Sequence, residues 1–308
     1  MNVQIKSLHC FVTLLEVGNY TRAAEKLHLT QPTLSKMIQR LEDNLEQPLL
    51  IRNNQKVIAT EAGRMLANSA QQIVGQWHRL QEDINSLNGL QTGQLRLGVC
   101  PMMGEMIIGL LSEYRKRFPK IEVSIVELGG FGAEQALLND TLDLTFTALP
   151  TTHSQEFNSH NLKGYPLLAC IPNGHELEKA EAITWAALEP HPFILYNDDF
   201  SLAKLIHRLS RKANIELNVA AQSGQWDFIA AMVEAQMGLA ILPKPICDKI
   251  NSSKLVYRPL SPNLTWDLAL IWRKNLPLTP AAESFIKLSK ELSPRAKQNC
   301  NIKQQDDS

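Results

Sequence analysis

The stretch YTRAAEKLHLTQPTLSKMIQRLEDNL, residues 20–45, holds two short helical patterns separated by a polar break and a proline. Within the break, Thr30 is a good N-cap for a following helix. Pro32 falls in the first turn of that helix, where a missing N–H has no intrahelical acceptor to lose. The pattern therefore predicts a helix that begins abruptly with a fixed first turn, which suits a helix presented to a partner.

The flanking residues complete a three-helix unit. An earlier helix, ended by Gly18, is indicated by apolar residues at i, i+3, i+4 and i+7: Leu8, Phe11, Val12 and Leu15. A second helix is predicted from Thr21 to about Leu27. Its Ala23–Ala24 pair offers the small side chains that let another helix pack closely.

The third helix has two contrasting faces. Its apolar stripe is Leu34, Ile38, Leu41 and Leu45, and short polar and long basic side chains lie opposite. The segment PLLIRNNQKVIAT, residues 48–60, then indicates two short strands around a turn, that is, a β-wing. The order predicts a winged helix-turn-helix, whose recognition helix enters a DNA major groove. The residues predicted to contact DNA are Thr30, Gln31, Pro32, Thr33, Ser35, Lys36, Gln39, Arg40, Arg52, Asn53 and Lys56.

A family resemblance covers this whole region. Residues 11–63, FVTLLEVGNYTRAAEKLHLTQPTLSKMIQRLEDNLEQPLLIRNNQKVIATEAG, are similar to the N-terminal signature of the LysR-type transcriptional regulators. Leu50–Ile51 departs from the family, which more often has phenylalanine and an acidic or polar residue there; this changes packing under the wing and leaves the DNA face intact. The alternative is a plain three-helix lobe with a solvated polar face, which the capped third helix and basic wing disfavour.

A long helix is predicted after Thr60. Apolar residues alternate spacings of four and three, as in a coiled-coil seam: Leu66, Ala70, Ile73, Trp77, Leu80, Ile84 and Leu87. The alternative is a helix packed on its own domain, because three heptads are few. The LysR resemblance implies that this helix pairs with its copy in a homodimer, with two dimers forming a homotetramer. The seam residues predicted to mediate dimerisation are Leu66, Ile73, Trp77, Leu80, Ile84 and Leu87.

The remainder alternates strand and helix patterns. Strands at 95–99, 122–128 and 142–149 enclose helices at about 102–118 and 131–139, an order that predicts a parallel sheet with helices on both faces. A second α/β unit follows from residue 166 to 243, then a strand at 266–274 and a helix at 279–292. In LysR regulators this region resembles a two-lobed periplasmic binding protein, with crossovers placed here near Lys163–Pro166 and Thr265–Trp266.

The expected fold is therefore α/β with an N-terminal winged helix-turn-helix, a linker helix and a two-lobed effector domain. The DNA-binding domain spans residues 1–60 and the linker helix 61–89. The first lobe spans 93–164 with 266–292, and the second lobe spans 165–265. Residues 293–308 have almost no apolar content and are predicted to form a disordered tail.

A ligand cleft is expected at the carboxyl ends of the parallel strands. Chain order places there loop and helix-start residues that suit a small anion such as a carboxylate. They are Cys100, Pro101, Met102, Gly129, Gly130, Phe131, Thr147, Phe200, Ser201, Ser223, Gln225 and Trp226. Each has an ordinary loop or core role as its alternative. Many relatives have serine or threonine at Cys100–Pro101–Met102, so a smaller or more apolar ligand is implied.

Four segments resemble the CidR-like subgroup: VCPMMG, VELGG, LDLTFTALP and QSGQWDFIAAMVEAQMGLAILP. Regulators of that subgroup resemble activators of holin-like membrane-protein genes and overflow-metabolism genes that respond to acetate or a related short acid. The resemblance implies promoter DNA and a small effector as partners and allows RNA polymerase as a further one.

Composition excludes several other classes. The 308 residues carry no net charge, but residues 1–60 hold seven Lys/Arg and five Asp/Glu, which permits a small DNA-binding part. We expect a cytoplasmic protein, because no export signal and no apolar run of membrane-spanning length occur. Those absences and the N-terminal ninety residues also disfavour a transport-type solute-binding protein.

Catalytic motifs, metal-ligand spacings and cofactor motifs are missing from the sequence, so we expect neither an enzyme nor a cofactor. Five scattered cysteines without a C-x-x-C pair indicate reduced thiols rather than disulfides or zinc ligands. The main rival within the same fold is a thiol redox sensor built on Cys100.

Overall fold

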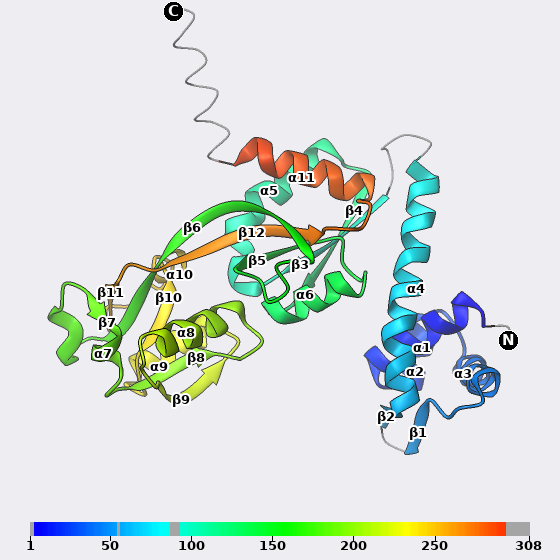
Figure 1. The fold of residues 1–308 in the computed structure, drawn as a ribbon, viewed down its shortest axis with the longest axis horizontal. Helices are drawn as coiled ribbons and strands as arrows, with labels where there is room; N and C mark the ends of the chain where they lie inside the picture. Colours follow the sequence, from blue (N-terminus) through cyan, green and yellow to red (C-terminus); the bar gives the residue numbers. More distant parts are fainter. Residues whose placement is uncertain (1–2, 54–55, 87–92, 294–308) are drawn as a thin grey trace, which may run out of the picture. The chain divides into compact units, whose positions relative to one another are not determined.

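The structure is a computed structural model that describes residues 3–53, 56–86 and 93–293. The chain divides into two compact units, one of residues 1–89 with Leu138–Thr141 and the other of the remaining residues. Figure 1 shows the order of the elements along the chain. Each unit is described by itself.

The described residues of the first unit form four helices and a two-stranded wing. The helices are α1 (Ile5–Val17), α2 (Tyr20–Lys26), α3 (Gln31–Leu45) and α4 (Glu61–Ser86), and the wing strands are β1 (Leu50–Asn53) and β2 (Lys56–Ala59). The strands pair antiparallel, with Leu50 opposite Ala59. The predicted order of three helices, wing and long helix is confirmed.

Local signals set the helix boundaries as the sequence indicated. Gly18 ends α1 in the left-handed conformation with φ 67°, which suits a residue without a Cβ. Thr30 caps α3 by accepting the Thr33 N–H, with Pro32 in the first turn. The Asn19 cap of α2, which accepts the N–H groups of Thr21 and Arg22, was not predicted.

The second unit is built on one long mixed sheet in the order β4-β3-β5-β12-β6-β11-β7, with β10 also paired to β6. Its strands are β3 (Gly93–Val99), β4 (Ile121–Glu127), β5 (Leu144–Leu149), β6 (Phe157–Pro172), β7 (Ile183–Thr184), β10 (Ala240–Pro243), β11 (Leu255–Ser261) and β12 (Thr265–Arg273). A separate parallel pair is formed by β8 (Pro192–Tyr196) and β9 (Asn218–Ser223).

Helices cover these sheets. In the first lobe they are α5 (Gly104–Arg117), preceded by the 3-10 turn η1 (Pro101–Met103), α6 (Gly130–Leu138) and α11 (Pro280–Leu292). In the second lobe they are η2 (Glu176–Lys179), α7 (Trp185–Leu188), α8 (Ser201–Lys212), α9 (Trp226–Glu234) and α10 (Lys244–Cys247). Figure 1 shows α5 and α11 on one side of β3 and β5 and α6 on the other.

The predicted parallel arrangement holds for β3, which pairs parallel with both β4 and β5. Strand β5 is buried along Leu144–Ala148, because helices and neighbouring strands surround it. The two lobes are joined by β6 and β12, which pair antiparallel up to Thr265 opposite Pro166. Strand β11 and the first half of β6 were not predicted, since Pro259 and the polar run of residues 158–164 disfavour strand assignments from sequence.

Candidate functional site

The first candidate site is the face of α3 opposite its buried stripe. Leu34, Ile38 and Leu41 are buried, with exposed fractions of at most 2 %. The side chains of Gln31, Pro32, Thr33, Lys36, Gln39 and Arg40 are exposed, and Ser35 is half-buried. The buried stripe therefore anchors the helix in its own unit, and the opposite polar and basic face is left open to a partner.

The wing is held on α3 by a carboxylate contact. The N–H groups of Leu49 and Leu50 donate to Glu42 Oε1 at 2.8 and 3.2 Å. The Thr60 hydroxyl donates to Pro48 O at 2.7 Å, and a Cβ at Gly63 would clash with the Leu49 carbonyl. These contacts fix the wing relative to the recognition helix.

The departure at Leu50–Ile51 has little consequence for this anchoring. Leu50 is buried under the wing, and Ile51 is 49 % exposed. Arg52, Asn53 and Lys56 belong to the wing strands β1 and β2. Their side chains lie outside the described residues.

The predicted seam on α4 divides into two parts. Ala70 is buried and Leu66 packs partly against the core of α1–α3, together with Val74. Further along, Ile73, Trp77, Leu80 and Ile84 are 43, 41, 49 and 56 % exposed. The seam side chains of Ile73, Trp77, Leu80 and Ile84 are therefore left open, and Leu87 lies outside the described residues.

The second candidate site is a corner where the two lobes of the second unit touch. The Phe131 N–H, at the start of α6, donates to Asp199 O at 3.1 Å. A Cβ at Gly129 would lie 2.5 Å from Asp199 Oδ2, and one at Gly130 would lie 2.9 Å from Ser201 Cβ. Glycine at both positions allows the first lobe to approach the start of α8.

A small cavity of about 150 Å³ opens beside this corner. It lies among α6, the segment after β5 and α8, and its lining is Phe131, Glu134, Leu149, Pro150, Thr151, Thr152, Ser201, Lys204, Leu205 and Arg208. Lys204 and Arg208 give the lining two positive charges, and the Lys204 Nζ stands 4.1 Å from the centre of the Phe131 ring. Ligand pockets for drug-sized molecules span about 300–1,000 Å³, so this one suits only a few heavy atoms.

Glu134 is the only acidic residue among the described lining residues, and its carboxylate already accepts hydrogen bonds. It is 3 % exposed and accepts the N–H of Thr152 at 2.9 Å and that of His153 at 3.3 Å. His153 Nδ1 lies 3.3 Å from the same carboxylate. Glu134 therefore fixes the segment after β5, and the positive charges of α8 face the cavity beside it.

The structure brings many of the predicted effector residues together. Phe131 and Ser201 line the cavity, and Gly129, Gly130 and Thr147 lie at the corner. Cys100, Met102 and Phe200 are buried, whereas Pro101 is exposed. The remaining predicted residues lie around the start of α9: Ser223, Gln225 and Trp226. The Asn197 N–H donates to Ser223 O at 3.2 Å. None of the three lines the cavity.

The neighbouring charges that raise the pKa of the buried Cys100 thiol are negative. Burial, with smaller contributions from the carboxylates of Asp199 and Glu127, raises the pKa of the Cys100 thiol to about 12. Within the described residues, the buried hydroxyls of Thr147 and Tyr196 have no hydrogen-bond partner. An unpaired buried hydroxyl costs about 1–3 kcal/mol, so these two groups are suited to a polar ligand atom.

Sequence reasoning missed Asp199, Lys204 and Arg208. Lys204 and Arg208 are four residues apart on the exposed side of α8, a spacing that signals one shared helix face. Nothing in the sequence indicates that this face turns toward α6, because the contact joins residues about seventy positions apart. Among the described residues, no group of three histidine, cysteine, aspartate or glutamate side chains is placed to hold a metal ion.

Comparison with known proteins covers most of the chain. Residues 5–64 match the bacterial regulatory helix-turn-helix model of the lysR family, and residues 88–293 match the LysR substrate binding domain model. The chain is 30% identical over 290 residues to the uncharacterized HTH-type transcriptional regulator YwbI of Bacillus subtilis, covering 94% of this chain and 96% of that protein.

Solved structures share the fold. Full-length OxyR C199D of Pseudomonas aeruginosa gives a TM-score of 0.70 at 21% identity, covering 96% of both chains. Full-length CbnR complexed with its target DNA gives a TM-score of 0.65 at 19% identity, covering 94% of this chain and 99% of CbnR.

The two matched family models and the winged helix-turn-helix all indicate a transcriptional regulator. The relatives are transcriptional regulators rather than enzymes. Among the described helices, none is long and apolar enough to cross a membrane. The chain belongs to the LysR family, and it is a DNA-binding transcriptional regulator with an effector-binding domain.

Proposed function

We propose that the exposed face of α3 and the wing contact promoter DNA. The supporting observation is that the buried stripe of α3 leaves Gln31, Ser35 and Lys36 on the opposite, open face. Short polar side chains there can reach base edges, and basic ones can reach phosphates. The wing residues Arg52, Asn53 and Lys56 belong to the same proposed surface.

The open part of α4 is the proposed pairing surface of a homodimer. Ile73, Trp77, Leu80 and Ile84 keep the four-three-four spacing of a coiled-coil seam, and a second copy would cover them. Further exposed apolar side chains on the second unit offer contacts for pairing dimers into a tetramer: Ile108, Ile125, Val126, Val219 and Phe228. Paired chains set two recognition helices at a fixed half-site spacing.

The proposed effector is acetate or a related short carboxylic acid, bound at the lobe corner. The observation that carries this is the cavity of about 150 Å³ with Lys204 and Arg208 beside Phe131 and Leu149. A carboxylate is matched by the two cations, and a short alkyl group by the apolar side chains. Because the lining comes from both lobes, such a ligand stabilises the closed arrangement and shifts the population toward it.

The test uses the full-length protein and the DNA upstream of its own gene, footprinted with and without millimolar acetate. Acetate is expected to change the length or bending of the protected DNA. Lys204→Gln should weaken the acetate effect about fivefold, since an exposed charge pair contributes at most about 1 kcal/mol. Lys212→Gln, at the end of the same helix, is the matched control and should respond like the wild type.

Two outcomes would separate the parts of this proposal. Protection that ignores acetate in the wild type would remove the effector assignment and leave the DNA surface standing. Equal acetate responses of Lys204→Gln and Lys212→Gln would place the ligand elsewhere.

The rival redox mechanism makes a different prediction. A sensor thiol needs exposure and a lowered pKa. Cys100 is 3 % exposed, and burial raises its pKa to about 12, so it stays protonated at neutral pH. We expect Cys100→Ser to keep the wild-type acetate response, and peroxide to leave DNA binding unchanged, both measured by gel shift. Loss of a peroxide response in Cys100→Ser would instead support the sensor.

Two finer assignments rest on the sequence resemblance. We infer that the chain is a CidR-like activator and that RNA polymerase is a further partner. We also propose that it acts in the cytoplasm, because promoter DNA is found there. The small cavity supports the subgroup's short-acid effector, because its volume of about 150 Å³ matches a few heavy atoms.

A further inference from the structure

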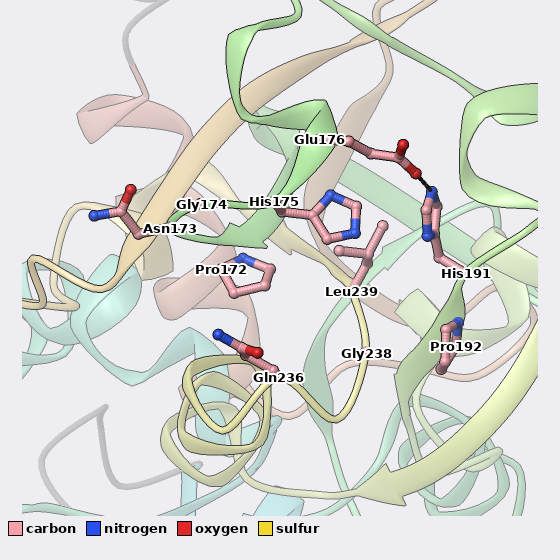
Figure 2. A pocket seen from close by; sticks show the side chains of 10 residues that line it. All are labelled: Pro172, Asn173, Gly174, His175, Glu176, His191, Pro192, Gln236, Gly238 and Leu239. Atoms are coloured by element: carbon pink, nitrogen blue, oxygen red, sulfur yellow. Dashed lines mark ion pairs between the residues drawn. The ribbon is translucent and has the colours of Figure 1, made fainter.

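A second cavity, of about 500 Å³, lies in the second lobe. It lies where β6 ends at Pro172 and where β8 and β10 begin, as Figure 2 shows. Strand β8 runs from Pro192 at this cavity to Tyr196, which precedes the lobe corner. The two cavities share no lining residue.

Backbone segments around this cavity are closely packed. The Leu239 N–H donates to Pro192 O at 2.8 Å, and a Cβ at Gly238 would lie 2.6 Å from the same oxygen. Gly174 and Gln236 both have left-handed backbone conformations, with φ of 83° and 59°. Gln236 therefore retains a side chain at a turn position that usually favours glycine or asparagine, and its amide lines the cavity (Figure 2).

Two histidines form one wall. The rings of His175 and His191 meet edge to face with centroids 4.6 Å apart. His191 Nε2 lies 3.3 Å from Glu176 Oε1. His175 Nδ1 accepts the Leu177 N–H at 3.2 Å, so the proton of the neutral ring is on Nε2. Burial and the neighbouring His191 lower the pKa of His175, which keeps that ring neutral at pH 7.

The charges of the lining do not favour an anionic ligand. None of the ten described lining residues is lysine or arginine, and Glu176 carries the formal negative charge. That carboxylate is 74 % exposed and engaged by His191. A phosphate or carboxylate would therefore find no lysine or arginine among the described lining residues to match its charge.

The remaining chemistry suits a flat, uncharged molecule. The imidazole of His175 presents a planar ring surface, and Pro172 and Pro192 add apolar lining. The amide of Gln236 offers a donor and an acceptor, the combination that pairs with the edge of a nitrogen heterocycle. Histidine rings are among the side chains on which unpaired bases stack.

We propose that this cavity is a second ligand site, specific for an uncharged planar nitrogen heterocycle of the nucleobase kind. The ring stacks on His175, and its polar edge pairs with Gln236. The site is separate from the effector corner, and β8 connects the two because it joins Pro192 at one to Tyr196 near the other. Helix α9 also extends from Trp226 to Glu234, two residues before Gln236.

The test is calorimetric titration of the full-length protein with adenine and, separately, with adenosine 5′-monophosphate. Adenine is expected to bind saturably in the submillimolar range, and the monophosphate at least about tenfold more weakly, because Glu176 repels its phosphate. Absence of saturable adenine binding at millimolar concentrations would overturn the proposal, as would tighter binding of the monophosphate.

A matched pair of variants locates the site. His175→Asn removes the ring but retains an N-capping side chain for η2, and should weaken adenine binding about tenfold. His207→Asn removes a half-exposed histidine of α8 outside the cavity and should leave adenine binding unchanged. Unchanged DNA binding by both variants confirms that they are folded. Equal adenine affinity of the two variants would refute the assignment to this cavity.

Discussion

Replacing both Leu80 and Ile84 with glutamate is expected to convert the protein to monomers and to weaken operator binding by about 10²- to 10⁴-fold. The two side chains are 49 and 56 % exposed on α4, and pairing with a second copy would bury them. Burying an aliphatic side chain contributes about 1.5–3 kcal/mol, whereas a glutamate there would bury a carboxylate with no partner. A monomer carries one recognition helix, so it binds a single half-site and loses the affinity gained by binding two linked half-sites.

Light scattering gives the mass of the variant in solution, and a gel shift on a two-half-site operator gives its affinity. The matched control places the same two charges away from the seam, with Asn68→Glu and Gln72→Glu, both at exposed positions of α4. The control should remain dimeric and bind as the wild type does. A dimeric Leu80→Glu, Ile84→Glu variant would show that pairing uses another surface.

Lys36→Ala is expected to produce the second large effect, a loss of DNA affinity that is nearly the same for every sequence. Lys36 is exposed on the open face of α3. A lysine that neutralises one phosphate contributes about 0.9 to the slope of log affinity against log salt, so a dimer should lose about 2 units of slope. Ser35→Ala and Gln31→Ala should instead relax base preference, because a specific hydrogen-bonded pair with a base discriminates by about 1–3 kcal/mol.

The measurement is a titration of operator and unrelated DNA at several salt concentrations. Lys6→Ala, which replaces an exposed lysine of α1, is the control and should keep the wild-type slope. A wild-type slope in Lys36→Ala, together with unchanged base preference in Ser35→Ala, would contradict the assignment of α3 as the recognition helix.

The sequence predicted most of the DNA-binding unit because its signals are local. Gly18, Thr30 and Pro32 act through the backbone of their own turns, and the stripe of Leu34, Ile38 and Leu41 depends only on helix periodicity. The anchoring of the wing by Glu42 was not predictable in the same way. Glu42 lies on the half-buried edge of α3, and its role depends on where the chain returns at Leu49 and Leu50.

In the effector domain, the sequence determined the order of strands and helices and the approximate positions of the strand ends. It placed Gly129, Gly130, Phe131, Thr147 and Ser201 near a cleft, because carboxyl ends of parallel strands share one edge of a sheet. The residues from the second helix start, Ser223, Gln225 and Trp226, come close to the corner without lining its cavity.

Only the tertiary structure decided the charges and partners at these sites. Lys204 lies against the Phe131 ring, and Asp199 lies against Gly129. In each pair the two residues are about seventy positions apart in the sequence, so the contact depends on how β6 and β12 join the lobes. The same holds for His175 and His191, which lie sixteen positions apart in the sequence and whose ring centroids the fold brings to 4.6 Å. Periodicity and capping act within one or two turns of chain, whereas a ligand site is made where distant segments pack together.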